Sequence, residues 1–442
     1  MFSLKHNQLK IAITILLVSV STFIYAQQIY SLNDVLKIAL ETNYSIQVAK
    51  NDAEIARVNN YAGNAGMMPR INGTVLQDNQ TANTDQKYAN GTDKSGRNAQ
   101  SNQFAANIEL GWTIFDGFKM FASRNKLKEL QDIGEMRFRF QSEFIFARVI
   151  RAYYDVVQNK QLLKMNTESV KLSEERFQLA KDRYTSGKAA KNEMLNAQVD
   201  LNTDKSVMIR QANALKNNKA LLLQTIGADI TKEFDVADNI DVNPSLKFDS
   251  LRANALSQNS SILLAKKNAR VSQLSIKEIE SERMPNLQLY SGYNYSNSSS
   301  QSGFLQSNLS NGYHFGAGVS MNIFNGFNVN KRMQAAKIYL QSNDLVLKDT
   351  MSRVDLSIKQ SYNTYLTSLE LVKFEKENVE VATSNFELAS EQYKIGVINS
   401  LELRTAQQNL LQSQSRYSSV QYEAKLAETD LIRISGGLLS IK

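Results

Sequence analysis

The chain has 442 residues, with 51 Lys and Arg against 43 Asp and Glu, two His, no Cys and three Pro. The lack of cysteine excludes disulfide scaffolds, zinc–cysteine sites, thiol nucleophiles and an acylated N-terminal cysteine. Removal of the leader predicted below would leave His314 alone, which excludes multi-histidine metal sites. Proline is far below its usual share of about 5%, so the sequence permits long uninterrupted helices.

The first 26 residues have the pattern of a secretory signal peptide. Lys5 and Lys10 precede an apolar run from Ile11 to Val20, and the segment ends in Ala26. We expect cleavage after Ala26 and export, with an uncleaved membrane anchor as the alternative. No later segment is apolar enough for a spanning helix, so the mature chain is soluble beyond the inner membrane or embedded by other means. Its cations are scattered among acids along helices, and we expect no nucleic-acid partner.

Two internal repeats organise the chain. We assign residues 27–230 to the first repeat, 231–246 to an acidic linker and 247–442 to the second repeat. The matching segments are Ala39–Asn43 with Ala255–Asn259, Met68–Pro69 with Met284–Pro285, Ile114–Phe118 with Ile323–Phe327, and Tyr184–Leu201 with Tyr393–Leu410.

Each repeat has the same order of elements. Residues 32–62 show helical apolar spacing, with Ser31 as a plausible N-cap, and this helix stops before Pro69. Long helical hairpins follow at 119–227 and 328–435, turning near Gly187 and Gly396. At 1.5 Å per residue, the first helix of each hairpin would be about 100 Å long.

Between the proline and the Phe-x-Gly motif the apolar period changes from 3.6 to 2. This alternation predicts β-hairpins at about 70–115 and 286–324, with polar loops at about 78–102 and 297–311. No charged residue occurs from Pro285 to Asn330. One predicted face consists of Phe104, Ala106, Ile108, Leu110, Trp112 and Ile114, and in the second repeat of Tyr313, Phe315, Ala317, Val319, Met321 and Ile323.

Strands with one apolar and one polar face are typical of outer-membrane barrels, although a half-buried sheet in a soluble protein would show the same alternation. Export favours the barrel. Four strands cannot close one, because membrane barrels begin at about eight strands and an open edge cannot face lipid. We therefore expect a shared barrel, and the residues leave two, three or four copies open. Helices of about 100 Å must project into water, as a helical tube or as a solid bundle.

The duplicated order of helix, proline, hairpin, Phe-Asp/Asn-Gly, long helix, Tyr-x-x-Gly turn and helix resembles the outer-membrane efflux protein family, the TolC-like exit ducts. The resemblance covers the whole mature chain, and its most specific parts are Ile114–Phe118, Ile323–Phe327, Tyr184–Gly187 and Tyr393–Gly396. It implies an α+β membrane protein, a homotrimer whose transmembrane β-barrel, with four strands per chain, continues as a long α-helical coiled-coil barrel across the periplasm. It also implies a periplasmic adaptor and an inner-membrane pump as partners, outer-membrane lipid around the barrel, and no cofactor or catalysis.

The resemblance further implies a periplasmic gate at Tyr184, Glu193, Tyr393 and Glu402. This chain departs from the family pattern, because a second carboxylate position falls on Thr405 and the first turn carries lysines, so strong cation selectivity is not expected. Seam packing for each Tyr and an exposed ion pair for each Glu are the alternatives. Arg404 is expected to be an exposed helix charge, with pairing across the closure as the alternative. The adaptor-facing turn residues are Gly187, Lys188, Lys191, Gly396, Val397 and Ser400.

The remaining assignments concern the strand-to-helix turns. Gly117 and Gly326 are expected to turn the chain, with Phe115 and Phe324 near the membrane interface, and Trp112 is expected to be a lipid-facing anchor. The Asp116/Asn325 pair is a candidate helix cap. No carboxylate pair sits beside a nucleophile motif, so we do not expect an enzyme. The function expected is a passive gated exit duct for efflux or type I secretion; the alternatives are an exported coiled-coil structural protein or adhesin, and a general porin.

Overall fold

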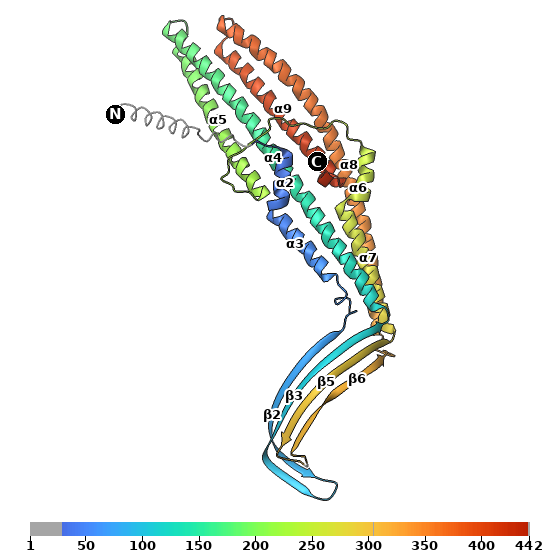
Figure 1. Ribbon diagram of the computed structural model, residues 1–442. Coiled ribbons are helices and arrows are strands. Elements are labelled where there is room, and N and C mark those ends of the chain that lie inside the picture. The colour runs from blue at the N-terminus through green and yellow to red at the C-terminus, as the bar shows by residue number, and fades with distance from the viewer. Residues whose placement is uncertain (1–28, 304, 441–442) are drawn as a thin grey trace, which may run out of the picture. The chain divides into compact units, whose positions relative to one another are not determined.

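The structure is a computed structural model that describes residues 29–303 and 305–440 (Figure 1). The predicted signal peptide lies outside the described residues. The chain divides into two compact units, each built from separate stretches of sequence. The helical unit contains the described residues up to Gln47, then Ser142–Arg252 and the chain from Ser357 onward. The sheet unit contains Val48–Gln141 and Ala253–Leu356.

The sheet unit carries a four-stranded antiparallel sheet in the order β2-β3-β5-β6 (Figure 1). The strands are β2 (Arg70–Lys87), β3 (Asp93–Asp116), β5 (Asn286–Ser300) and β6 (Ser307–Ser320). The predicted loops at 78–102 and 297–311 are wrong in length, because the strands continue far into both segments. Backbone hydrogen bonds of a ladder do not depend on apolar side chains, so the polar composition did not end the strands.

The register of the sheet sorts its side chains onto two unlike faces. Ile108 pairs with Tyr293, which pairs with Tyr313, and the two tyrosine rings lie 4.8 Å apart. One residue along β3, Asn107 pairs with Asn294. Two residues further on the same face, Glu109 pairs with Gly292. Since successive side chains of a strand point to opposite faces, one face is rich in aromatic and aliphatic groups and the other is polar. The alternation predicted for β3 and β6 therefore aligns across the sheet as far as Trp112 in β3 and Val319 in β6. Ile114 lies at a bulge between Thr113 and Phe115, and Met321 and Ile323 lie beyond the end of β6, so these three do not continue the predicted face.

The strand-to-helix turns of the two halves have the same backbone conformation. Gly117 and Phe118 have φ of 69° and 70°, and Gly326 and Phe327 have φ of 66° and 62°. A phenylalanine in the left-handed backbone conformation costs about 1–2 kcal/mol. The packing around each turn must therefore stabilise this conformation. At Gly117 a Cβ atom would lie 2.5 Å from the carbonyl oxygen of Ser281, which leaves no room for a side chain.

Aromatic contacts and one cap accompany these turns. Phe115 and Phe118 meet edge to face at 5.2 Å, and Phe324 and Phe327 do so at 5.3 Å. The Asp116 carboxylate accepts the backbone N–H of the second residue of the following helix at 3.0 Å. For Asp116, the predicted cap is thus present.

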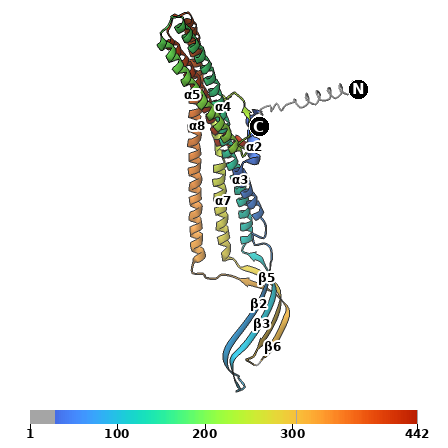
Figure 2. The same cartoon turned by 90° about the vertical axis from the view of Figure 1, so that its left-hand side faces the viewer.

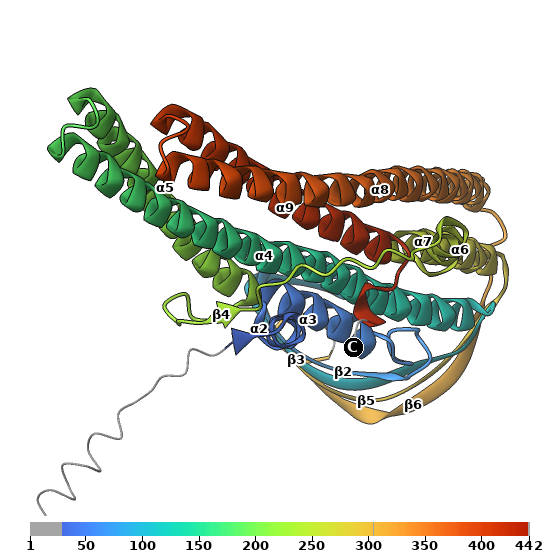
Figure 3. The same cartoon turned by 90° about the horizontal axis from the view of Figure 1, so that it is seen from above.

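The helical unit is dominated by two hairpins, in which α4 folds back on α5 and α8 on α9 (Figure 3). Their bounds are α4 (Lys119–Thr185), α5 (Lys191–Ile226), α8 (Asn328–Lys394) and α9 (Ser400–Ile434). The two long helices both have 67 residues, and their partners have 36 and 35. The first parts of α4 and α8 belong to the sheet unit. None of the described helices has an apolar stretch of the length that a membrane crossing requires.

The helix predicted over 32–62 is broken at Asn43 into α2 (Leu32–Thr42) and α3 (Tyr44–Asn59). The Asn43 amide donates to the carbonyl oxygen of Thr225 at 2.8 Å, and its Oδ1 accepts the N–H of Ile46 at 3.0 Å. The second half is broken in the same way at Asn259, between α6 (Phe248–Gln258) and α7 (Ser260–Glu280). The predicted N-cap at Ser31 is confirmed, since its hydroxyl accepts the N–H of Asp34 in a capping box.

A short parallel ladder joins the start of the described chain to the linker. β1 (Ile29–Tyr30) pairs with β4 (Asp235–Val236). Lys160 of α4 donates to the Asp235 carboxylate at 2.7 Å and to the Val236 carbonyl at 2.8 Å. The chain continues through a 3-10 turn, η1 (Ser281–Arg283), before β5 and ends the described part with η2 (Leu438–Ser440).

Candidate functional site

The turns of the two helical hairpins lie at the same end of the helical unit (Figure 2). Both turns place glycine in the left-handed region, with φ of 74° at Gly187 and 83° at Gly396. The backbone N–H groups after each helix return to its last carbonyls, from Lys188 to Arg183 at 2.8 Å and from Val397 to Gln392 at 2.9 Å. This pattern ends a helix and reverses the chain within a few residues.

Tyr393 is the buried centre of this end of the unit. Its side chain is 1% exposed, although it lies only three residues before Gly396. An aromatic ring buried so close to a chain reversal fixes the position of both helices of its hairpin. The residues packed around it are Ala389, Leu403 and Ala406, with Leu179, Phe386 and Ile398 at the margin.

Three contacts with two residues join Tyr393 to the first hairpin. Its hydroxyl donates to Oε1 of Glu193 at 3.2 Å, which we call the tip contact. The guanidinium of Arg183 lies 4.6 Å from the centre of its ring and donates to its backbone oxygen at 2.7 Å. Residues about 200 positions apart in the sequence therefore hold the two tips together through one hydrogen bond, one cation–π contact and one backbone contact.

The surroundings keep the Tyr393 hydroxyl protonated. Burial raises the pKa of Tyr393 above its ordinary value, and the nearby charge of Glu193 raises it further. A raised pKa means that the neutral form of the hydroxyl is favoured, so Tyr393 remains a hydrogen-bond donor at neutral pH.

The structure separates the other two predicted gate residues from this contact. Tyr184 is 39% exposed. Glu402 is exposed at the start of α9, where its Oε1 accepts the Asn399 amide at 2.6 Å and its N–H bonds to Asn399 Oδ1 at 3.0 Å. Thus Tyr393 and Glu193 meet, whereas Tyr184 and Glu402 do not join them within one chain.

The predicted adaptor-facing residues form the outer surface of the turns. Ser400 is partly buried at the first position of α9. The exposed members are Gly187, Lys188, Lys191, Gly396 and Val397.

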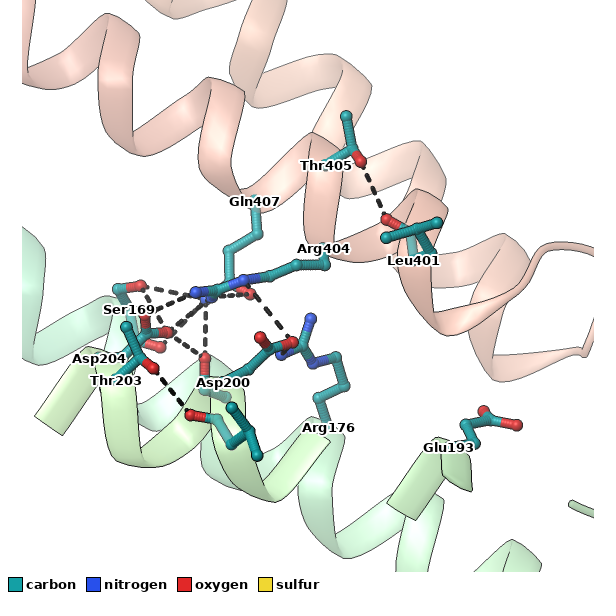
Figure 4. Close-up of polar contacts among 12 residues, drawn as sticks. Ser169, Arg176, Glu193, Asp200, Thr203, Asp204, Leu401, Arg404, Thr405 and Gln407 are labelled. Carbon is teal, nitrogen blue, oxygen red and sulfur yellow. Dashed lines mark hydrogen bonds and ion pairs between the residues drawn. The ribbon is translucent and has the colours of Figure 1, made fainter. Parts of the chain in front are cut away.

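The expectation that Arg404 is an exposed helix charge is wrong. Its side chain is buried, and its Nη1 and Nη2 donate to the two carboxylate oxygens of Asp204, each at 2.7 Å (Figure 4). Thr405, the next residue, points its hydroxyl back to the Leu401 carbonyl at 3.0 Å. The carboxylate partners of Arg404 come from the first repeat, so the local sequence of α9 gave no indication of them.

At the strand end of the sheet unit, Trp112 keeps a partly exposed ring. Its indole N–H donates to the carbonyl oxygen of Met67 at 3.1 Å. Trp112 pairs with Leu289 on the apolar face of the sheet. An amphipathic ring in this position has one hydrogen-bonded end and one apolar end, as interface residues require.

Comparison with known proteins agrees with this architecture. The curated outer membrane efflux protein BepC of Brucella suis is 19% identical over 334 residues, which cover 74% of this chain and 71% of BepC. The outer membrane protein TolC of Vibrio cholerae is 21% identical over 310 residues, which cover 66% of this chain and 70% of TolC.

Solved structures share the fold over most of the chain. The CmeC outer membrane channel of Campylobacter jejuni matches with a TM-score of 0.75 at 17% identity and covers 92% of this chain and 85% of its own. The outer membrane protein VceC of Vibrio cholerae matches with a TM-score of 0.73 at 14% identity, covering 92% and 96%. The family model for outer membrane efflux proteins matches residues 35–228 and 251–437. The chain therefore belongs to the outer membrane efflux protein family and has the fold of the TolC-like channels.

Proposed function

We propose that the protein is a passive, gated exit duct of the outer membrane, working in a tripartite efflux or type I secretion system. It would carry small toxic compounds or exported polypeptides out of the periplasm. The observation that carries this proposal is the four-stranded sheet with one apolar face and two open edges, β2 and β6.

The open edges support a barrel shared between copies. In lipid each backbone polar group needs an internal partner, so β2 of one copy would pair with β6 of another. Three copies, the number that the family resemblance implies, would give about twelve strands, within the range of known barrels. The apolar face would then meet lipid, with Trp112 at its margin.

The helices support a duct that extends beyond the membrane. A helix of 67 residues is about 100 Å long, whereas the hydrocarbon core of a bilayer is about 30 Å thick. Hairpins of this length, repeated around an axis, would continue the barrel as a tunnel through the periplasm.

The tip contact supports closure at the far end of that tunnel. Tyr393 and Glu193 join the second hairpin to the first, and movement of either hairpin would have to break their hydrogen bond. In this proposal Tyr184 and Glu402, exposed in one chain, face neighbouring copies. The exposed turn residues would dock a periplasmic adaptor, which connects the duct to an inner-membrane pump.

The charges near the turns argue for weak ion selectivity. Lys188 and Lys191 are exposed in the first turn, and Thr405 is uncharged. A ring of carboxylates would attract cations, but adjacent lysines reduce that field.

Single-channel recording of the detergent-purified protein in planar lipid bilayers tests the proposal. We expect a small, flickering conductance, because the duct is closed at one end. A large and steadily open current would instead indicate a general porin. If no current appears and the protein stays dispersed without detergent, the duct is wrong and an exported coiled-coil structural protein or adhesin replaces it.

A further inference from the structure

A second set of contacts between the hairpins lies deeper in the helical unit than the turns (Figure 4). All of its members are buried or half-buried polar side chains, and they come from three helices. We call this set the buried clamp, and its residues are Ser169, Ser173 and Arg176 of α4, Asp200 and Asp204 of α5, and Arg404 and Gln407 of α9.

The centre of the buried clamp is the two-pronged pair of Arg404 with Asp204. Their residues are 9% and 8% exposed, and both nitrogen–oxygen distances are 2.7 Å. The Ser173 hydroxyl donates to the same carboxylate at 2.5 Å. Gln407 adds bonds from its amide to the Ser169 backbone and hydroxyl, each at 3.1 Å. Each charge-assisted hydrogen bond is about twice as strong as a neutral one, and the two-pronged geometry adds specificity.

A second ion pair completes the cluster. Arg176 is 3% exposed and donates to Asp200 at 2.6 Å, and the Nε of Arg404 lies 3.8 Å from the same carboxylate. Two guanidinium groups therefore face two carboxylates, and their charges balance. Among the described residues, Nε and Nη1 of Arg176 and Nε of Arg404 are buried without a hydrogen-bond partner. These groups already lack full compensation, so the cluster depends strongly on its two ion pairs.

The buried clamp and the tip contact differ in strength. The tip contact is one hydrogen bond of 3.2 Å from a neutral hydroxyl. Arg404 lies four residues into α9 and Asp204 lies 13 residues into α5, so the clamp is set back from the turns by about 6 Å along α9 and about 20 Å along α5. If α9 moved away from α4 and α5, it would leave two buried charges unpaired, which costs more than the loss of one hydrogen bond from a hydroxyl to the half-buried Glu193 carboxylate.

We propose that the buried clamp limits how far the two hairpins of one chain part when the tip contact opens, with Arg404 and Asp204 as its positioning residues. This inference rests on the proposed gate. In an opened tip, the segments beyond the clamp separate while α9 stays attached to α4 and α5.

The test compares unitary conductance in planar bilayers in a Tyr393→Phe background, which removes the tip hydrogen bond but keeps the ring. Adding Asp204→Asn should raise the conductance about twofold above Tyr393→Phe alone, because parting now continues past the clamp and shortens the constriction. Adding Arg404→Lys, which keeps the charge but loses the two-pronged geometry, should give an intermediate value. The control is Glu174→Gln, because Glu174 forms an exposed ion pair with Lys205 between the same helices, α4 and α5.

Equal conductance of Tyr393→Phe and Tyr393→Phe/Asp204→Asn would show that the buried clamp does not limit the opening, and would overturn the proposal. If Asp204→Asn prevents assembly, Arg404→Lys decides alone, and an unchanged conductance overturns the proposal. Hydrogen exchange in detergent separates the clamp from the proposed function. Faster exchange in α9 around Arg404 with Asp204→Asn, but not with Glu174→Gln, would support the clamp even if no variant conducts, whereas unchanged exchange would contradict it.

Discussion

At the scale of single residues, Tyr393 and Tyr184 show how one motif can serve two environments. Both precede a turn glycine by three positions, but only Tyr393 is enclosed, beneath Arg183 and against Glu193. The family resemblance implied a gate role for both tyrosines and favoured Tyr393. It could not give their surroundings, because these depend on partners about 200 residues away in the sequence.

Replacement of Tyr393 by Phe should open the tips more often than the same change at Tyr184. Phenylalanine keeps the buried ring and removes the donor, and a hydrogen bond to a charged group is worth about 1.5–3 kcal/mol, which corresponds to a change in open probability of about tenfold or more. Single-channel recording of Tyr393→Phe and Tyr184→Phe provides the comparison. Equal effects of the two changes would contradict the special role given to Tyr393.

Asp204 should give the helical unit a stability that disappears only in strong acid. Burial alone would raise the pKa of Asp204, but hydrogen bonds from Arg404 and Ser173 outweigh burial and lower it below the ordinary 3.8. A lowered carboxyl pKa stabilises the fold above 3.8, and this stability is lost as pH falls through the folded-state value. The melting temperature, measured by circular dichroism, should therefore fall as the pH drops below 3.8. In Asp204→Asn the melting temperature should change less with pH. An identical acid profile for both proteins would refute this assignment.

At the scale of elements, the change of apolar period predicted the strands and the absence of proline predicted the long helices. The breaks at Asn43 and Asn259 were missed, since asparagine interrupts a helix only when its side chain finds a better partner. For Asn43 that partner is the carbonyl of Thr225, at the far end of α5. Strand lengths were underestimated for a related reason: pairing continued after the apolar alternation had stopped.

The end of α5 gives an element-scale prediction. Gly227 has φ of 77°, and a Cβ atom there would lie 2.5 Å from the backbone oxygen of Thr42. Gly187 has φ of 74°, with open space at the same position. Gly187→Ala should cost about 1 kcal/mol of unfolding free energy from backbone strain alone, and Gly227→Ala clearly more. Chemical unfolding of the two variants measures both, and equal losses would show that α2 does not press against this helix end.

At the scale of the whole molecule, membership of the family could be predicted from the sequence because its signature segments occur twice. The number of copies could not, because four strands per chain are compatible with two, three or four copies and no local motif chooses among them. The gate stays a prediction, of which the structure brings Tyr393 and Glu193 into contact, and nothing in the sequence indicated the buried clamp. Arg404 and Asp204 stand 200 positions apart, and each looks like an ordinary surface charge in its own helix.

The two faces of the sheet make a prediction about membrane assembly. Phe315 lies on the apolar face and is 87% exposed in one chain, whereas Ser310 pairs with Ser296 on the polar face. Phe315→Lys should cost about 2–4 kcal/mol of insertion free energy, and Ser310→Lys should be tolerated. The fraction of protein recovered in the outer membrane compares them. Similar recovery of both variants would mean that the apolar face does not contact lipid.

Neither compact unit is encoded by one continuous stretch, and this governs the order in which the molecule can form. The helical unit cannot be completed until the chain beyond Ser357 has been synthesised. The sheet gains β5 and β6 long after β2 and β3 have been synthesised. Until then the early hairpin has an apolar face and an unpaired β3 edge, both of which favour aggregation. A newly made chain therefore exposes these surfaces until β5, β6 and the segment beyond Ser357 have been synthesised.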